Sequence, residues 1–540
     1  MHLYSGADIR TMIPRWRSLE LTPNFEIVSA KNLNKTSLSF SNGKAHLAKF
    51  VAEWKRAPSL ITASDLLDAA FVFGQNKETQ EAALFVMTNK NYASEGLLTS
   101  AKCILFNHWK SKSAVSTLEN ISHEIALAKI RHIKSILIDA PRDSIALTEL
   151  ARMYAYIGQT KQSEASLERA LKLTPDNRYI LRSAANFFSN NEKHEKALSY
   201  IWKSESVKSD PWIQAAEIAL TTRSSKGPRF AGKQLRHSKT MSVKSHGASE
   251  LLLGLASLEF KNGAKNKYVR KLVENSLPFA TENGLAQAVW IGDQAGFELP
   301  TYQLLKNTPR AFEASYYSLM EEEKYDRATV AAISWKNDQP LSPDASIEGA
   351  YTASVLIGDH SKGIEIANDA LATHPNNFTI HNNLYYSQIV SGDVSGGLDT
   401  LKKLRHLADS EYRSMYLYAA TGLLAYAVGD VEAGGAIYER TCELANEQKD
   451  ASSLIRAVIH WAEQDSKYAN MDAKEFDDLS TVIDKRLKSY SANDAKDIKR
   501  LWKVKKETIS ASIAQSSLIE GNPSSNVSAE DFIKKFSDVE

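Results

Sequence analysis

The sequence has few of the features that mark a secreted, membrane-spanning or metal-binding protein. Its 540 residues include only two cysteines, Cys103 and Cys442, which lie far apart and belong to no cluster with zinc-site spacing. No apolar run approaches the roughly 18 residues of a transmembrane helix. The first residues lack the apolar core of a secretory signal. We therefore expect a cytoplasmic protein, from a bacterium, that does not associate with membranes.

Motifs for nucleotide binding and for common hydrolytic reactions are also absent. We find no GxxxxGK[ST] loop, no GxGxxG after a strand and no GxSxG. His123 and Glu124 begin a string that resembles HExxH, but its fifth position is Leu127. The sequence therefore predicts no enzyme activity, no metal site and no cofactor.

A large excess of one charge is missing as well. The chain has 66 basic and 64 acidic residues, which gives a formal net charge of +2 with neutral histidines. Overall charge thus gives no reason to expect binding to nucleic acid or to a membrane surface. Any such binding depends on a local patch.

What the sequence does contain is a recurring glycine phrase. IGDHSKG, SGDVSGG and VGDVEAGG include Gly358, Gly392 and Gly429, at intervals of 34 and 37 residues, and YIGQTKQSEA around Gly158 is related to them. A helical stretch precedes and follows each phrase. This period is typical of helical-hairpin arrays, in which each unit buries its apolar face against its neighbours. The pattern predicts an all-α fold.

Residues 144–177 form the clearest unit. Its apolar residues recur at helical spacing on both sides of Gly158, and Pro175 blocks further helix. Position by position, this unit resembles the tetratricopeptide repeat (TPR), with mild departures at Leu147 and Ser163. The residues in register are Leu147, Leu150, Ala151, Tyr154, Gly158, Ser163, Leu167, Ala170 and Pro175.

The resemblance implies a right-handed α-solenoid of TPR-like hairpins that follows a short non-helical or mixed N-terminal segment. Two tracts are regular, and the intervening units are degenerate but still helical in period. The expected segments are an N-terminal cap (1–45), degenerate hairpins (46–143), a regular tract (144–210), degenerate repeats (211–343), a second regular tract (344–446), C-terminal helices (447–507), and a linker and tail (508–540).

In the TPR family, particular positions of the first helix of each hairpin face a concave groove. The resemblance assigns this role to Thr148, Arg152, Tyr156, Arg182, Asn186, Glu348, Thr352, Asn382 and Tyr386. Arg182 and Asn186 also match part of the clamp with which some TPR proteins hold a peptide carboxylate. The next hairpin supplies no further part of that clamp in register.

Two basic places are alternative binding surfaces. One is a stretch without acidic residues, containing Arg223, Lys226, Arg229, Lys233, Arg236, Lys239 and Lys244. It would attract phosphate groups, or it is simply a solvated face. The other is Arg15-Trp16-Arg17, which either binds an acidic or aromatic partner or docks as a cap on the first hairpin.

Together these features predict a scaffold or adaptor that binds a partner protein or peptide through the groove. One alternative is a nucleic-acid-associated adaptor that uses residues 223–246. Another is a regulatory subunit of a separately encoded enzyme, such as a nuclease.

Overall fold

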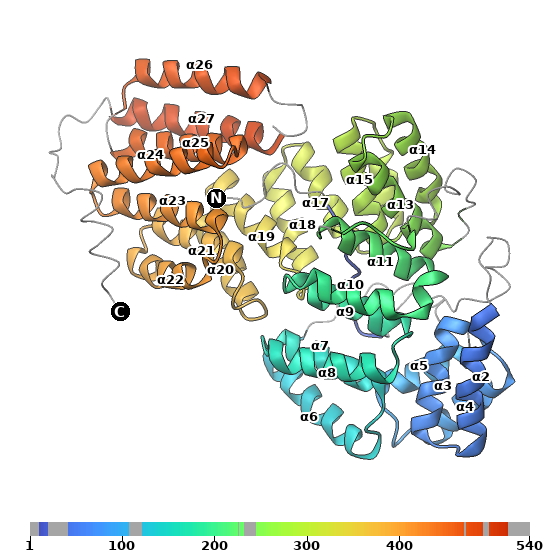
Figure 1. The fold of residues 1–540 in the computed structure, drawn as a ribbon. Helices are drawn as coiled ribbons and strands as arrows, with labels where there is room; N and C mark the ends of the chain where they lie inside the picture. Colours follow the sequence, from blue (N-terminus) through green and yellow to red (C-terminus); the bar gives the residue numbers. More distant parts are fainter. Residues whose placement is uncertain are drawn as a thin grey trace. The chain divides into compact units, whose positions relative to one another are not determined.

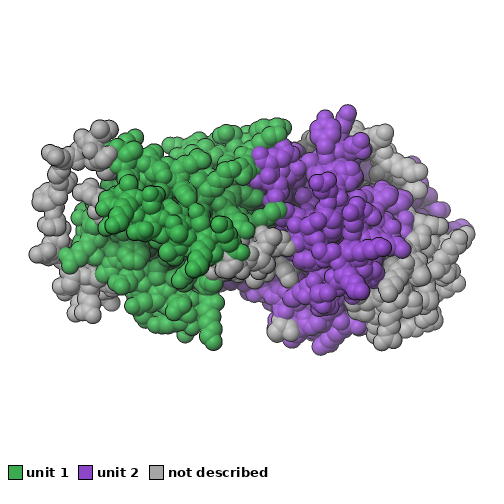
Figure 2. Space-filling model, turned by 90° about the horizontal axis from the view of Figure 1, so that it is seen from above, with its two compact units in different colours: residues 1–8, 323–333, 343–540 green, residues 9–322, 334–342 purple. Residues whose placement is uncertain are grey.

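The computed structural model describes most of the chain, and its regular structure within the described residues is helical. The described ranges are 10–19, 41–106, 121–224, 226–231, 243, 245–468, 471–489 and 496–516. The predicted all-α class is confirmed, and consecutive helices pack as hairpins in the manner of TPR units (Figure 1). The chain divides into two compact units, coloured separately in Figure 2.

Unit 2 consists of residues 9–322 and 334–342 and contains the earlier hairpins. Its helices are α2 (Ser41–Arg56), α3 (Leu60–Phe73), α4 (Lys77–Thr88), α5 (Glu95–Phe106), α6 (His123–Asp139), α7 (Ser144–Tyr156), α8 (Thr160–Leu173), α9 (Arg178–Asn190), α10 (His194–Lys203), η3 (Glu205–Lys208), α11 (Pro211–Thr222), α13 (His246–Lys261), α14 (Asn266–Ser276), η5 (Leu277–Phe279), α15 (Glu282–Ala295), α16 (Thr301–Asn307) and α17 (Phe312–Glu321).

Unit 1 consists of residues 1–8, 323–333 and 343–540 and contains the later hairpins. The helix α18 (Tyr325–Asp338) has residues in both units. The other helices of unit 1 are α19 (Asp344–Tyr351), the π-helical η6 (Thr352–Ile357), α20 (His360–Leu371), α21 (Phe378–Val390), α22 (Val394–Leu407), α23 (Glu411–Ala427), α24 (Val431–Glu447), α25 (Ala451–Tyr468), α26 (Ala473–Ser489) and α27 (Lys496–Ser516).

The hairpin of α7 and α8 shows how the sequence pattern produces the repeat. Asp143 caps α7 by accepting a hydrogen bond from the backbone N–H of Ala146 at 2.8 Å. Gly158 in the turn has a positive φ of 69°, which glycine adopts without steric cost. Where the helices cross, the Ser163 hydroxyl donates to the carbonyl of Ala151 at 2.7 Å. The residues of the repeat pattern thus fix both the turn and the crossing.

The later hairpins have glycine both at the turn and at the crossing. Gly358, Gly392 and Gly429 have φ values of 84°, 90° and 89°. A Cβ atom on Gly434 would lie 2.6 Å from Cδ2 of Tyr426, closer than real side chains approach. The two helices of this hairpin therefore pack closely where they cross.

Two helix ends differ from the expected segments. The helix α2 begins at Ser41, inside the expected N-terminal cap, and Gly43 falls in its first turn. At the other end, α27 continues past residue 507 to Ser516. Tertiary contact holds this end, because Ile509 is fully buried and the Ser512 hydroxyl donates to the carbonyl of Ser466 at 3.0 Å. The rest of the expected tail lies outside the described residues. No described helix is both long and apolar enough to cross a bilayer.

Candidate protein-binding site

A short extended segment near the N-terminus, residues 10–19, lies against helices of unit 2 (dark blue in Figure 1). We call it the strap. Its side chains at Met12, Trp16, Arg17 and Leu19 are buried, each 5% exposed or less. The helices and loop residues that contact it are called the strap site.

Side chains of α9 and α15 hold the backbone of the strap. A segment without a helical or sheet ladder leaves most of its carbonyl groups in need of a donor from outside, although the Thr11 carbonyl accepts from the backbone N–H of Ile13 at 2.8 Å. The hydrogen bonds run from Asn186 Nδ2 to Pro14 O (2.8 Å), from Asn283 Nδ2 to Ile13 O (3.2 Å) and from Gln287 Nε2 to Arg10 O (3.2 Å). The Tyr179 hydroxyl lies 2.9 Å from Arg17 O, but its single proton is shared with the carboxylate of Glu149. Three of the strap's carbonyls are thereby satisfied by amide donors of the strap site.

Three buried carboxylates, Glu282, Glu313 and Asp338, pair with the arginines of the strap. We call them the acidic trio; their exposed fractions are 7%, 6% and 7%. They come from α15, α17 and the end of α18. The ion pairs are Arg10 Nε to Glu313 Oε1 (2.7 Å), Arg15 Nη2 to Glu313 Oε2 (2.8 Å), Arg15 Nη1 to Glu282 Oε1 (3.3 Å), and Arg17 to both Glu282 and Asp338.

The arginines keep Glu282 and Glu313 ionised despite their burial. Burial alone would raise the pKa of Glu282, but the charges of Arg17 and Arg15 hold that pKa at about 2. In the same way Arg10 and Arg15 overcome burial and lower the pKa of Glu313. The strap and its site are therefore bound as opposite charges at neutral pH.

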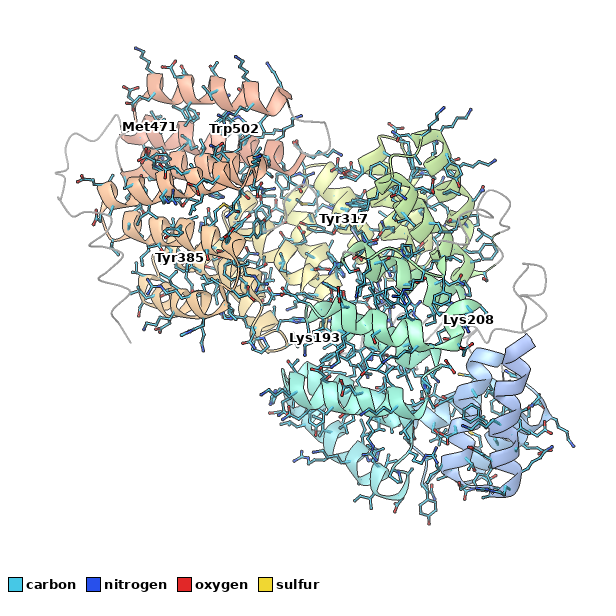
Figure 3. All side chains as sticks on the ribbon, in the orientation of Figure 1. Lys193, Lys208, Tyr317, Tyr385, Met471 and Trp502 are labelled. Carbon is cyan, nitrogen blue, oxygen red and sulfur yellow. The ribbon has the colours of Figure 1, made fainter. Side chains whose placement is uncertain are left out.

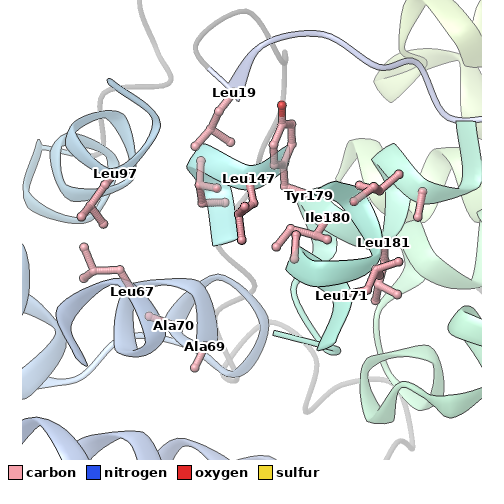
Figure 4. Close-up of a cluster of buried hydrophobic side chains, with 14 of the residues drawn as sticks. Leu19, Leu67, Ala69, Ala70, Leu97, Leu147, Leu171, Tyr179, Ile180 and Leu181 are labelled. Carbon is pink, nitrogen blue, oxygen red and sulfur yellow. The ribbon is translucent and has the colours of Figure 1, made fainter. Parts of the chain in front are cut away.

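Apolar contacts complete the strap site. Trp16 meets the ring of Phe187 edge-on, with centroids 6.1 Å apart. Leu19 belongs to the same buried cluster as Leu147 and Tyr179, and Figure 4 shows the three side chains close together. Arg15-Trp16-Arg17 thus meets acidic and aromatic groups of its own chain. Within the described residues it docks, but on α9, α15, α17 and α18 and not on the first hairpin as the cap prediction had it.

Among the predicted groove residues of unit 2, Asn186 contacts the strap directly. Its neighbour Arg182 pairs with Glu250 at 3.1 Å and lies over the ring of Trp212, with its guanidinium carbon 4.3 Å from the centroid. Asn186 therefore holds a backbone carbonyl, and Arg182 has a carboxylate partner inside the chain.

The other three predicted residues of unit 2 lie on α7 and make contacts within it. Thr148 is fully buried and donates to the carbonyl of Ser144 at 2.8 Å. Arg152 is 1% exposed; it pairs with Glu149 at 2.7 Å and lies over the ring of Tyr156. Their predicted role in binding stays a prediction.

In unit 1, the predicted groove residue Tyr386 lies beneath the C-terminal helix α27. Its hydroxyl accepts a hydrogen bond from Lys505 Nζ at 3.0 Å, and the same ammonium pairs with Glu463 of α25 at 2.9 Å. Lys505 is only 4% exposed. The remaining predicted residues, Glu348, Thr352 and Asn382, are half-buried or buried, and none is without a partner.

The described part of the basic segment is held by its own chain. Arg223 donates to the Thr11 hydroxyl at 2.7 Å, Lys226 pairs with Glu195 at 2.8 Å, and the Arg229 guanidinium carbon lies 3.7 Å from the Trp202 centroid. Lys233, Arg236, Lys239 and Lys244 lie outside the described residues. Within the residues the structure covers, no group of His, Cys, Asp and Glu side chains is arranged to hold a metal ion.

Sequence reasoning missed the acidic trio. Glu282, Glu313 and Asp338 fall in the irregular stretch between the two regular tracts, where no repeat register assigns positions to a binding face. Each is an ordinary acidic residue near a helix end, and its partners are far away in the sequence. The available signal was the cluster Arg15-Trp16-Arg17, because two arginines beside a tryptophan need acidic partners if they are buried.

Comparison with known proteins adds little to this picture. No protein-family model and no curated protein matches the chain. Among solved structures, the chain is similar to the "APC/C hetero-tetramer Cut9-Hcn1", with 13% identity over 90% of this chain and 99% of that one, at a TM-score of 0.39. It is also similar to "Yeast Tom70", with 13% identity over 85% and 98% of the two chains, at a TM-score of 0.32.

Proposed function

We propose that this chain is a protein-interaction scaffold and that the strap site of unit 2 binds an extended segment of a partner protein. The observation that carries the proposal is the set of three side-chain amide hydrogen bonds to strap carbonyls, from Asn186, Asn283 and Gln287. Carbonyl groups at regular spacing are present in every extended peptide. A surface that holds one such segment therefore has the donors to hold another.

The position of these donors on helices favours binding without rearrangement of the side chains that form the strap site. Asn186 and Tyr179 lie on one face of α9, and Asn283 and Gln287 lie on one face of α15. Helices fix their side chains more tightly than loops do, so little ordering is needed when a peptide binds. Asn186 is buried in the strap contact, and Asn190 also donates to its amide oxygen at 3.2 Å.

The test uses the full chain with the strap weakened by Arg15→Gln and Trp16→Ala, here called the strap variant. A set of labelled extended peptides, including the sequence of residues 10–19, is titrated against it and followed by fluorescence anisotropy. We expect binding that falls about tenfold or more when Asn186→Ala and Asn283→Ala are added, because both buried donors to the peptide are lost. The matched control is Asn262→Ala, an exposed asparagine at the end of α13.

Circular dichroism establishes that each variant keeps its helical content. If peptides bind a folded strap variant equally well with and without Asn186 and Asn283, the strap site is not the binding surface and the proposal is wrong.

For the nucleic-acid adaptor, no observation offers comparable support. The described cations of residues 223–246 have partners in their own chain, and the strap site carries three carboxylates, which repel phosphate. A subunit that regulates a separate enzyme is a scaffold whose partner is that enzyme. The same test of the strap site therefore applies to it.

A further inference from the structure

We propose that the strap is a competitor in cis for the partner and that the partner segment carries arginines at the strap's spacing. In this view residues 10–19 occupy the strap site in the unbound chain, and an arginine-bearing extended segment of a partner binds by displacing them. The inference deepens the proposed function and rests on it, because it specifies the chemistry and the regulation of the same site.

The acidic trio explains why the ligand must be basic. Among the described residues, the ion-pair partners of Glu282, Glu313 and Asp338 are the three strap arginines and Arg310, which lies 3.5 Å from Asp338. If the strap leaves, Arg310 is the one cation among the described residues that still pairs with a carboxylate of the acidic trio. Buried charges without partners are costly, so the empty site strongly favours a new cationic occupant.

The contacts of each arginine explain why lysine is a poor substitute. Arg10 uses three nitrogens for three partners: Nε to Glu313 (2.7 Å), Nη1 to Gln287 (2.7 Å) and Nη2 to Asn283 (3.0 Å). Arg17 divides its two terminal nitrogens between Glu282 and Asp338. A planar guanidinium reaches separated acceptors at once, whereas a lysine ammonium is a single point. The site is therefore built for arginine.

The strap does not satisfy all of its own buried hydrogen-bond donors, so another segment can bind the strap site more favourably. Trp16 Nε1 and Arg17 Nε are buried and have no hydrogen-bond partner among the described residues. An unmet buried donor costs free energy, and the one on Trp16 is avoided by an occupant that keeps the arginines and has another aromatic residue at this position. A phenylalanine at the Trp16 position keeps the edge-on contact with Phe187 and removes one unmet donor. The strap is therefore an occupant of its own chain that a partner segment with fewer unmet donors can displace.

The experiment compares the full-length wild-type chain with the strap variant, using a labelled synthetic peptide with the sequence of residues 10–19. We expect the strap variant to bind it about tenfold or more tightly than the wild type, because an occupied site lowers apparent affinity by the fraction that is free. Replacing all three peptide arginines by lysine weakens binding to the strap variant about tenfold or more. A Trp16→Phe peptide binds as well as the original or better.

Two controls separate site recognition from general attraction. A scrambled peptide of the same composition measures charge attraction alone, and it is expected to bind at least tenfold more weakly. Glu313→Gln in the strap variant removes the shared partner of Arg10 and Arg15 and weakens binding, whereas Glu274→Gln, at an exposed pair with Arg270, does not. If the strap variant does not fold, Arg10→Gln alone replaces it, since this change leaves the pairs of Arg15 and Arg17 intact.

The outcomes distinguish this inference from the function beneath it. Equal affinity of wild type and strap variant overturns the competition in cis. Equal affinity of the arginine and lysine peptides overturns the arginine requirement. In both cases binding that still depends on Asn186 and Asn283 leaves the proposed function standing. A folded strap variant that binds no extended peptide overturns both.

Discussion

The strap of unit 2 and the helix α27 of unit 1 cover predicted groove positions in different ways. The strap is extended, and its carbonyls take hydrogen bonds from α9 and α15. The helix α27 satisfies its own backbone and presents side chains alone. Leu501, Trp502 and Ile509 of α27 are buried, and Trp502 is labelled in Figure 3. A helix therefore needs an apolar surface to dock, whereas an extended segment needs donors from outside.

The two regions also compensate buried charge differently. In unit 1, Glu463 pairs with Lys505 at 2.9 Å and also with the more exposed Lys467 at 3.1 Å. In unit 2, the acidic trio shares the strap's three arginines and has Arg310 as its remaining cation. The loss of one cation is therefore expected to harm the strap site more than the site beneath α27.

The largest effect is expected from Arg17→Ala. The change leaves Glu282 and Asp338 buried with fewer cations, and we expect a loss of about 3–5 kcal/mol in the free energy of unfolding of unit 2. Urea titration read by chemical-labelling mass spectrometry of unit 2 peptides measures it. Arg270→Ala, at an exposed pair, is the matched control and changes stability by about 0.5 kcal/mol or less. A similar small effect of both substitutions would contradict the account.

Acid is expected to weaken the two units over different pH ranges. Burial lowers the pKa of His460 to about 4 from 6.5, so its protonation favours the unfolded state and unit 1 loses up to about 3 kcal/mol as pH falls through that interval. In unit 2, the pKa of Glu282 is about 2, below its usual 4.5, so its stabilisation is complete above 4.5 and is lost toward 2.

A group elsewhere in unit 2 increases this contrast. Burial raises the pKa of Asp65 to about 6, so the folded state binds the proton more tightly and unit 2 gains stability as pH falls from 6 toward 3.8. The same urea titrations at about pH 7, 5 and 3 measure both units. His460→Gln should remove the loss in unit 1 between 6.5 and 4; if that loss persists, His460 is not its source.

Local pattern was enough to predict the hairpins but not the strap. Gly158 and Leu147 belong to one unit whose register is readable within 34 residues, because each hairpin repeats the same packing problem. The pairing of Arg15 with Glu313 joins positions 298 residues apart. Neither residue belongs to a repeated pattern, so nothing local connects them. The repeat register does predict a groove position at Asn186, because such positions recur in every unit, and Asn186 contacts the strap; its binding of a partner stays a prediction.

A smaller effect is expected from Lys505→Ala in α27. Glu463 keeps Lys467 and lies near His460 after the change, so we expect a loss of about 3 kcal/mol or less in the stability of unit 1. Lys505→Met keeps most of the apolar stem and shows how much of the loss comes from packing. Urea titration read from α25 peptides measures both. A loss larger than that of Arg17→Ala would reverse the order of the two regions.

The smallest effects concern the glycine crossings, which set unit 1 apart from the serine crossing of α7 and α8. A Cβ on Gly434 would meet the Tyr426 ring at 2.6 Å, so Gly434→Ala should cost about 2 kcal/mol through overpacking. The next residue, Gly435, is the matched control, because the nearest atom to its Cβ would be 3.5 Å away. Gly435→Ala should stabilise α24 by about 1 kcal/mol, since alanine favours helix over glycine. Thermal unfolding followed by circular dichroism measures both changes. If Gly434→Ala destabilises and Gly435→Ala stabilises unit 1, Gly434 is needed for the close helix crossing. If both substitutions stabilise it, only helix propensity distinguishes glycine from alanine at these positions.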